Sequence, residues 1–498
     1  MVANYEYYRD EINADQVDIE AIKLIPADYA FENTVLPIKV ENNTMIVVLG
    51  TKTDKTIINT LKFITKKDIV CYVAEDELLK RNIKAIYEVA SIKRAVEDLK
   101  LDLGKETKKH ISEDTEIVNA PAVKLVESLL NKAISEKASD IHIEPEERDF
   151  RIRYRIDGSL INVFTLPKEI YNNIVTRIKV MCNMDISEKR IPQDGNFTHN
   201  FENSFYDMRV SSIPTVNDEK IVIRILDRYV NYLDINKIYF EQQQKSMIDK
   251  ILKHNHGIIL ATGPTGSGKS TTLYAMLKEL NKNNINITTI EEPVEYMMKG
   301  INQINVNNKA GITFARGLRS ILRQDPDVIM IGEIRDEETA AIAIRAAITG
   351  HLVLSTVHTN SAFGTINRLA EMGVERYLLA DAIIAVIAQR LVKKLCTFCR
   401  KEYKPSEYEA RVLNLNNDNV KLYRGEGCSK CHYTGYRGRV PVSEIMYVDD
   451  SVKQAIIKET LYNDHTVNND MINNCVKLVL NGLTTTDELI KVANGDIF

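Results

Sequence analysis

The chain has 498 residues, of which 44% are hydrophobic and 27% are charged, so it can form about three folded domains and is neither disordered nor collagen-like. Lys and Arg total 65 and Asp and Glu total 69, a formal net charge of −4. No overall positive field exists to hold nucleic acid or an anionic membrane, so we expect neither as a general partner.

The N-terminal residues and the apolar runs argue against export and membrane insertion. Residues 1–16 lack the basic start and apolar run of a signal peptide. The longest apolar stretches, such as 383–388, fall far short of the roughly 20 residues that span a bilayer. We therefore expect a cytoplasmic protein that reaches the membrane only through partners.

Residues 1–90 predict a small α/β domain, and residues 91–118 predict a linker. Short apolar strand patterns in the first segment alternate with helical patterns. The predicted strands are 36–40, 45–49 and 69–73, and the predicted helices are 56–64 and 76–89. The second segment is densely charged, so we expect a partly helical linker whose charges are solvated.

Residues 119–240 predict a second α/β domain, and residues 241–498 predict a third. The second domain opens with a helix, and Asp157-Gly158 is typical of a hairpin turn. Its predicted helix is 122–135, and its predicted strands are 140–144, 150–155, 159–163, 207–213 and 220–226. In the third domain, strands alternate with helices and Gly-rich turns, which indicates a parallel sheet covered by helices. Beyond Pro441 the chain is predicted to be mostly helical.

A glycine-rich run in the third domain matches the P-loop pattern G-x-x-x-x-G-K-[ST]. Its glycines let backbone N–H groups close around a polyphosphate at the N-terminus of a helix. Lys269 would contact the β- and γ-phosphates of ATP, and the Ser270 hydroxyl would help to hold Mg²⁺. The predicted nucleotide-binding residues are Gly263, Pro264, Thr265, Gly266, Ser267, Gly268, Lys269, Ser270 and Thr271.

Hydrolysis also needs a group that orients or deprotonates water, and three strand patterns end in candidates. A buried run ends at Glu333, at the carboxyl end of a parallel strand, where ligands bind in such folds. Gly332 stands where an acidic residue usually precedes this glutamate. The other two strands lead to Glu291 and His358. An isolated histidine is usually structural, but its position at a third strand end favours function, and we predict all three as catalytic.

Four of the seven cysteines form two C-x-x-C pairs, Cys396 with Cys399 and Cys428 with Cys431. Two such pairs supply the ligands of a closed, structural Zn²⁺ site. The segment between the pairs is longer than in the commonest zinc ribbons. Disulfide bonds are the competing interpretation, which a reducing cytosol disfavours.

Four segments of the third domain together resemble the secretion ATPase superfamily, in its type II secretion and type IV pilus assembly branch. They are GPTGSGKST, TIEEPVEY, DPDVIMIGEIRDEETA and LVLSTVHTN, in the order typical of that family. In family terms they are the Walker A motif, the aspartate box, the atypical Walker B motif and the histidine box. The family usually has Glu-Asp-Pro where this chain has Glu291-Glu292-Pro293, so the second carboxylate is one methylene longer.

The middle domain also resembles that family, through the segments ASDIHIE, RYRIDG, RIPQDG and MRVS. The resemblance implies that Arg209 and Arg224 bring positive charge to the nucleotide during phosphoryl transfer. The alternative is that both arginines pair with local carboxylates. The family usually has Arg after Gln-Asp-Gly, whereas this chain has Asn196.

The resemblance implies a RecA-like P-loop ATPase core over 241–498, preceded by a PAS-like second N-terminal domain and a small docking domain over 1–90. It supports zinc in a module over 396–440, so ATP, Mg²⁺ and Zn²⁺ are the expected cofactors. Some relatives bind cyclic di-GMP through a leading Arg-Leu-Gly motif. Residues 1–25 lack that motif, so we expect no such ligand.

The resemblance further implies a homohexamer at the inner face of the cytoplasmic membrane that powers type IV pilus assembly through an inner-membrane platform protein. Type II secretion and DNA uptake are the alternatives within the family. A nucleic-acid-translocating ring ATPase and a nucleotide-binding scaffold without turnover are the rivals outside it. The near-neutral charge argues against the first rival, and the set Glu291, Glu333 and His358 argues against the second.

Overall fold

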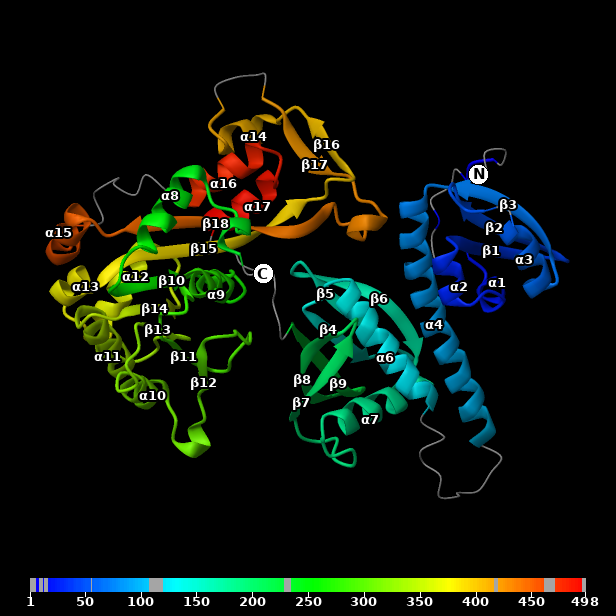
Figure 1. Ribbon diagram of the computed structural model, residues 1–498, viewed down its shortest axis with the longest axis horizontal. Helices are drawn as coiled ribbons and strands as arrows, with labels where there is room; N and C mark the ends of the chain where they lie inside the picture. The colour runs from blue at the N-terminus through cyan, green and yellow to red at the C-terminus, as the bar shows by residue number, and fades with distance from the viewer. Residues whose placement is uncertain are drawn as a thin grey trace. The chain divides into compact units, whose positions relative to one another are not determined.

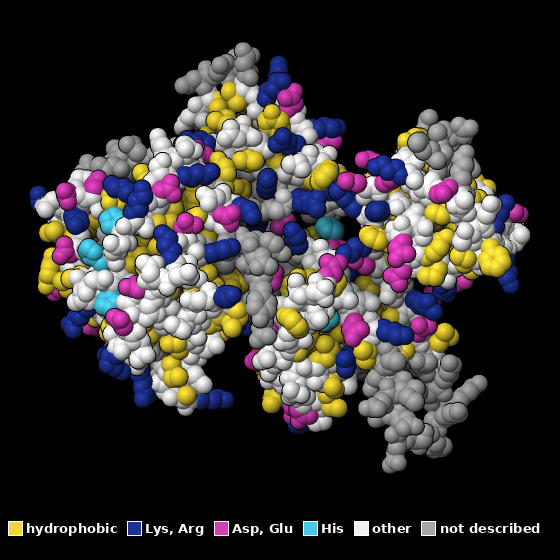
Figure 2. Space-filling view, in the orientation of Figure 1, with side chains coloured by type: hydrophobic (Ala, Val, Ile, Leu, Met, Phe, Trp, Pro, Cys, Tyr) yellow, Lys and Arg dark blue, Asp and Glu magenta, His cyan; other side chains and the backbone are white. Residues whose placement is uncertain are grey.

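The computed structural model describes residues 6–8, 12, 17–54, 56–106, 120–227, 234–415, 420–460 and 471–494. The chain divides into two compact units, Met1–Ile225 and Leu226–Phe498. In the described part of the chain, no helix is long and apolar enough to cross a membrane. Basic and acidic side chains both occur across the face drawn in Figure 2, in keeping with their nearly equal totals.

The first unit begins with a small sheet in the order β1-β2-β3. Strands β1 and β2 form an antiparallel hairpin, and β3 lies parallel to β2. Leu36, Val48 and Leu61 are fully buried in the core beneath the sheet. These strands and the helix α3 confirm the predicted pattern, whereas α1 and α2 were not predicted. The elements are α1 (Ile19–Lys23), α2 (Ala27–Glu32), β1 (Val35–Glu41), β2 (Thr44–Gly50), α3 (Thr56–Thr65) and β3 (Asp68–Ala74).

A single long helix, α4 (Asp76–Glu106), continues into the segment expected to be a linker. Its residues Ile92, Ala95, Val96 and Leu99 are buried in one core with side chains of α6 (Ala120–Ser135). Their spacing places them on one face of a helix. The many charged residues between them made this apolar face hard to recognise in the sequence. The rest of the expected linker, 107–118, lies outside the described residues.

The second part of this unit is a sheet in the order β6-β5-β4-β9-β8-β7, with α6 and α7 packed on one face. Along β4, Ile141 and Ile143 enter the core, while the alternate residues Asp140, His142 and Glu144 face away from it. The five predicted strands are present, and β7 adds one that was not predicted. The elements are β4 (Asp140–Pro145), β5 (Asp149–Ile156), β6 (Ser159–Pro167), α7 (Tyr171–Met181), β7 (Gln193–Phe201), β8 (Ser204–Thr215) and β9 (Asp218–Asp227).

The second unit is built on a sheet in the order β12-β11-β13-β14-β10-β15-β18 (Figure 1). The pairs from β12 to β15 are parallel, and β18 pairs antiparallel with β15 at the edge. The strands are β10 (Gly257–Thr262), β11 (Ile287–Glu291), β12 (Asn302–Asn305), β13 (Val328–Ile331), β14 (Leu352–Val357), β15 (Ile383–Leu395) and β18 (Tyr436–Tyr447).

Helices cover both faces of this sheet, as predicted. Central strand β10 sends Ile258 and Leu260 into one core and Ile259 and Ala261 into the other. Both faces of the strand are therefore buried, which is typical of parallel sheets. The helices are α8 (Gln242–Ile251), α9 (Lys269–Leu280), α10 (Phe314–Ile321), α11 (Glu337–Ile348), α12 (Ala362–Glu371) and α13 (Arg376–Ala382).

A small module interrupts the chain between β15 and β18, and helices follow β18. The module contains the antiparallel strands β16 (Arg400–Tyr403) and β17 (Leu422–Gly425) and the helix α14 (Glu407–Val412). Strand β18 continues to Tyr447, so the helical tail starts later than Pro441. Its described helices are α15 (Asp450–Lys458), α16 (Met471–Leu480) and α17 (Thr486–Asn494).

Candidate functional site

The predicted P-loop joins the end of β10 to the start of α9 in the second unit. Gly263 and Gly268 have φ values of +139° and +91°, which favour glycine. A Cβ at Gly263 would also lie 2.3 Å from the carbonyl oxygen of Gln389 on β15. Since β15 packs against the loop this closely, both glycines are required by the fold.

Lys269 is the first residue of α9 and is held inside the loop. Its Nζ donates to the carbonyl oxygens of Gly263, at 2.6 Å, and Pro264, at 3.0 Å. Burial lowers the pKa of Lys269, and the nearby Glu333 carboxylate opposes that effect. Lys269 and Glu333 therefore belong to one electrostatic site.

Glu333 and His358, predicted from two separate strands, lie together in the structure. The Nε2 atom of His358 is 3.3 Å from Oε2 of Glu333, whose other oxygen contacts Arg335. Burial and the charge of Lys269 lower the pKa of His358, so its imidazole is neutral at pH 7. The structure thus brings a carboxylate, a neutral imidazole and the P-loop ammonium into one neighbourhood.

Arg335 is a member of this cluster that the sequence did not indicate. Its guanidinium contacts Glu333 and also lies 3.3 Å from a carboxylate oxygen of Glu292, in the aspartate box. The signal available was its position two residues after Glu333. An arginine there can reach both acidic strand ends because the carboxyl ends of parallel strands meet at one edge of the sheet.

Close packing explains why a glycine stands at position 332. A Cβ at this position would lie 3.3 Å from the Cα of Glu291 on the neighbouring strand β11. The acidic residue usual at this position would therefore push against β11. This leaves Glu333 as the acid at the end of β13.

Glu291, the last residue of β11, is buried and has other partners than Glu333. Its Oε1 accepts a hydrogen bond from Thr289 Oγ1 at 2.6 Å, and its Oε2 accepts one from the Tyr274 hydroxyl. Burial raises the pKa of Glu291, while the hydroxyl donors oppose that rise. Among the described contacts, this carboxyl is tied to helix α9 through Tyr274, a residue that the sequence reasoning missed.

The two predicted arginines lie on the charged face of the sheet in the first unit. Arg209 is on β8, opposite Asn196 of β7. Arg224 is on β9, and its Nε donates to Oδ1 of Asp140 at 3.1 Å. The Arg224 side chain is 64% exposed whereas that of Asp140 is 9% exposed. Arg224 thus has the local carboxylate partner that the alternative interpretation required.

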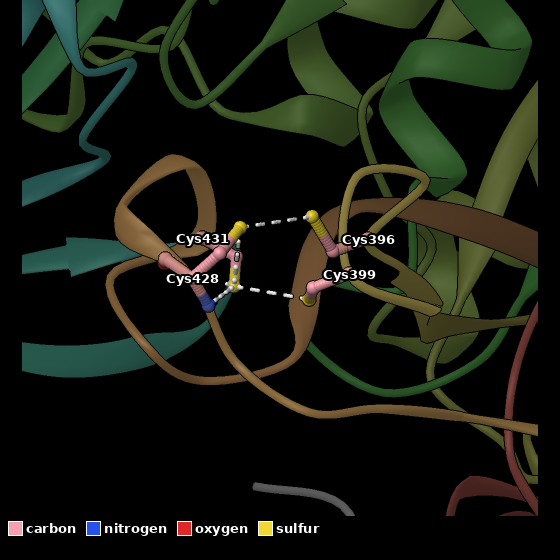
Figure 3. Close-up of side chains that lie close together, drawn as sticks. All are labelled: Cys396, Cys399, Cys428 and Cys431. Carbon is pink, nitrogen blue, oxygen red and sulfur yellow. Dashed lines mark hydrogen bonds between the residues drawn. The ribbon is translucent and has the colours of Figure 1, made fainter. Parts of the chain in front are cut away.

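The four predicted zinc ligands converge between β15 and β18 (Figure 3). The Sγ atoms of Cys396, Cys399, Cys428 and Cys431 lie within 4.8 Å of one another, and none forms a disulfide. Three of the sulfur pairs are 3.8 to 3.9 Å apart. Tetrahedral zinc with bonds of about 2.3 Å requires sulfurs about 3.8 Å apart. The residues therefore fit Zn²⁺, which would cross-link the two C-x-x-C pairs.

Loss of one cysteine should release the metal. We expect about one zinc per parent chain, and a Cys399→Ser variant with little or none and a lower melting temperature, because structural zinc contributes directly to folding. Elemental analysis and thermal melting measure both effects. Cys71→Ser, which changes a thiol outside the cluster, is the control. A parent protein that is free of zinc and as stable as Cys399→Ser would contradict the assignment.

The sheet order, the P-loop between β10 and α9 and the acids at the ends of neighbouring strands define a RecA-like P-loop ATPase. Residues 115–491 match the family model described as type II/IV secretion system protein, and residues 5–91 match the MshEN domain. The chain belongs to this secretion and pilus ATPase family, which confirms the resemblance read from the motifs.

Named relatives come from both branches of the family. Type II secretion system protein E of Pseudomonas aeruginosa is 44% identical over 384 residues, 76% of each chain. Type II secretion system protein E of Pectobacterium carotovorum subsp. carotovorum is 39% identical over 495 residues, 96% of this chain and 98% of that one. The type IV pilus assembly ATPase PilB of Myxococcus xanthus is 41% identical over 466 residues, 91% of this chain and 82% of that one.

Solved structures agree with the fold. The pilus retraction motor PilT with bound ADP has a TM-score of 0.52 and 27% identity, and the match covers 74% of this chain and 96% of that one. The Legionella pneumophila ATPase DotB has a TM-score of 0.57 over 78% of this chain and 98% of that one, at 20% identity. The second likeness concerns the fold only.

Proposed function

We propose that this protein is a cytoplasmic, hexameric ATPase that powers type IV pilus assembly through an inner-membrane platform protein. The supporting observation is the 41% identity to the pilus assembly ATPase over 91% of this chain. A match of that length must include part of residues 1–90, the proposed docking domain. The proposed domains are 1–90, the second N-terminal domain 119–240 and the ATPase domain 241–498. Of the expected linker 91–118, residues 91–106 belong to helix α4, which packs with α6.

Type II secretion is the second candidate, because a protein of that name matches over 96% of the chain. A strain that lacks this protein, complemented with the parent chain or with Lys269→Ala, separates the two. We expect the inactive variant to lose surface pili, scored by electron microscopy, and to keep normal protein levels in the medium. Intact pili with a loss of secreted proteins would assign the chain to type II secretion instead.

The proposed chemistry uses the groups that lie together around the P-loop. Lys269 would exchange its two backbone acceptors for phosphate oxygens of ATP. Mg²⁺, held with the help of Ser270, would neutralise phosphate charge. Glu333 would orient or deprotonate the attacking water, and the neutral His358 beside it would hold the carboxylate in place.

The arginines of the first unit are proposed to complete the site from another domain in the ring. A guanidinium that meets the phosphates in the transition state raises the rate more than it raises affinity. Arg209 is the stronger candidate, because Arg224 already donates to Asp140. The hydrogen bond between Arg224 and Asp140 would have to break before Arg224 could contact the phosphates.

Arg209→Ala should bind ATP with nearly the parent affinity and hydrolyse it slower by on the order of 10². Steady-state phosphate release and light scattering give the rate and the oligomer size. Arg81→Ala is the control, since Arg81 is an exposed arginine of the same unit that pairs with Glu77. If Arg209→Ala forms the parent oligomer and turns over normally, the middle domain does not take part in hydrolysis.

A further inference from the structure

Tyr274 connects helix α9, strand β11 and the loop that follows β11 through one buried hydroxyl. It lies on α9, five residues after Lys269, and is 1% exposed. Its hydroxyl donates to Oε2 of Glu291 and accepts from the backbone N–H of Glu295 at 3.3 Å. A buried tyrosine hydroxyl needs such partners, and here they come from β11 and from the loop that follows it.

The ring of Tyr274 adds a second contact with that loop. It packs edge-on against Tyr296, with ring centroids 5.1 Å apart and an interplanar angle of 82°. The P-loop helix is thus joined to the aspartate-box segment 291–296 by a hydroxyl and by an aromatic pair. Of these two contacts made by Tyr274, the one through the hydroxyl reaches the Glu291 carboxyl group.

We propose that Tyr274 is a positioning residue that orients the Glu291 carboxylate for ATP hydrolysis and couples it to the P-loop helix. The inference rests on the proposed ATPase function, in which Glu291 keeps the catalytic role that the sequence predicts. Ser270, the proposed Mg²⁺ ligand, lies four residues before Tyr274, and side chains at this spacing share one face of a helix. If α9 shifts when nucleotide binds at Ser270, the hydroxyl that holds Glu291 shifts with it.

The hydroxyl also favours the ionised form of Glu291. Burial raises the pKa of this carboxyl, and the hydrogen bonds from Thr289 and Tyr274 oppose that rise. The pKa of Tyr274 itself is raised by burial and by Glu291, so the phenol stays protonated and remains a donor. Removing the phenol oxygen should therefore raise the pKa of Glu291 further.

Tyr274→Phe tests this inference, because it keeps the ring and removes only the hydroxyl. We expect kcat to fall about tenfold, the order of a hydrogen bond to a charged group, with KM for ATP nearly unchanged. We also expect the acid limb of the kcat–pH profile to move to higher pH. Tyr403→Phe is the matched control, since it removes a tyrosine hydroxyl that donates to Glu409 away from the P-loop.

A double variant separates this inference from the proposed role of Glu291. If Tyr274 acts through Glu291, the effect of Tyr274→Phe on kcat should largely vanish in a Glu291→Gln background. The inference for Tyr274 would be overturned if Tyr274→Phe lowered kcat by the same factor with Glu291 and with Gln at that position. It would also be overturned if Tyr274→Phe kept the parent rate and pH profile while Glu291→Gln was slow. A parent-like Glu291→Gln would instead overturn the catalytic role of Glu291. Should Tyr274→Phe fold poorly, Thr289→Val, which removes the donor to the other carboxylate oxygen, should shift the same pH limb.

Discussion

A Lys269→Ala variant should lose ATP hydrolysis entirely within the detection limit of a phosphate-release assay. The ammonium is buried in the P-loop 2.6 Å from the carbonyl oxygen of Gly263, so it is already placed where phosphate charge would need neutralising. Alanine removes that charge and leaves the glycine-rich backbone in place. Affinity for ATP should fall as well, because the lysine contacts phosphates in the ground state too.

Lys278→Ala is the matched control for this variant. Lys278 lies on the same helix, α9, and is exposed at its far end. The control should keep the parent rate and melting temperature. Hydrolysis by Lys269→Ala at even a tenth of the parent rate would contradict the assignment of this loop as the phosphate site.

Glu333→Gln should bind ATP but lose most of the rate, by about 10³, the range of general base catalysis. Glutamine keeps the shape of the side chain and removes the charge that faces His358 and Arg335. Binding of a fluorescent ATP analogue and single-turnover phosphate release measure the two properties separately.

Glu338→Gln makes the same chemical change at an exposed acid that pairs with Arg319, and should behave as the parent. Glu333→Gln also removes the charge that Arg335 contacts and leaves Glu292 as the carboxylate beside that guanidinium, so tighter ATP binding by Glu333→Gln would agree with the proposal. Parent-like hydrolysis by Glu333→Gln would rule out its role in activating water.

The sequence indicated the phosphate site and its neighbours because strand ends are readable from apolar runs. Glu333 and His358 each follow such a run, and parallel strands bring their carboxyl ends to one edge, so the 3.3 Å approach follows from topology. Tyr274 was missed because a tyrosine inside an amphipathic helix looks like core. Only the structure shows that its hydroxyl meets the acid at the end of β11.

Elements were predicted correctly where apolar residues repeat with the period of a helix or a strand. Elements were missed where charged residues interrupt that repeat or where the pairing joins distant segments. In α4 the apolar stripe of Ile92, Ala95 and Leu99 is interleaved with charged residues, which indicated a linker. Strand β7 alternates exposed and half-buried residues and carries many polar side chains, so no apolar run marked it. The pairing of β15 with β18 depends on segments on either side of the cysteine module, which no local pattern can reveal.

The position of the cysteines bears on the edge of the ATPase sheet. Leu395 of β15 faces Tyr436 of β18, and residues 396–435 run between them. Closing a loop of this length costs about 3 kcal/mol of chain entropy, from the logarithmic dependence on length. A metal that binds Cys396 and Cys431 at the base of the loop would cross-link its two ends. Strands β15 and β18 would then be joined by a short effective connection, as in a tight hairpin. Their register would not depend on the conformation of the outer part of the module.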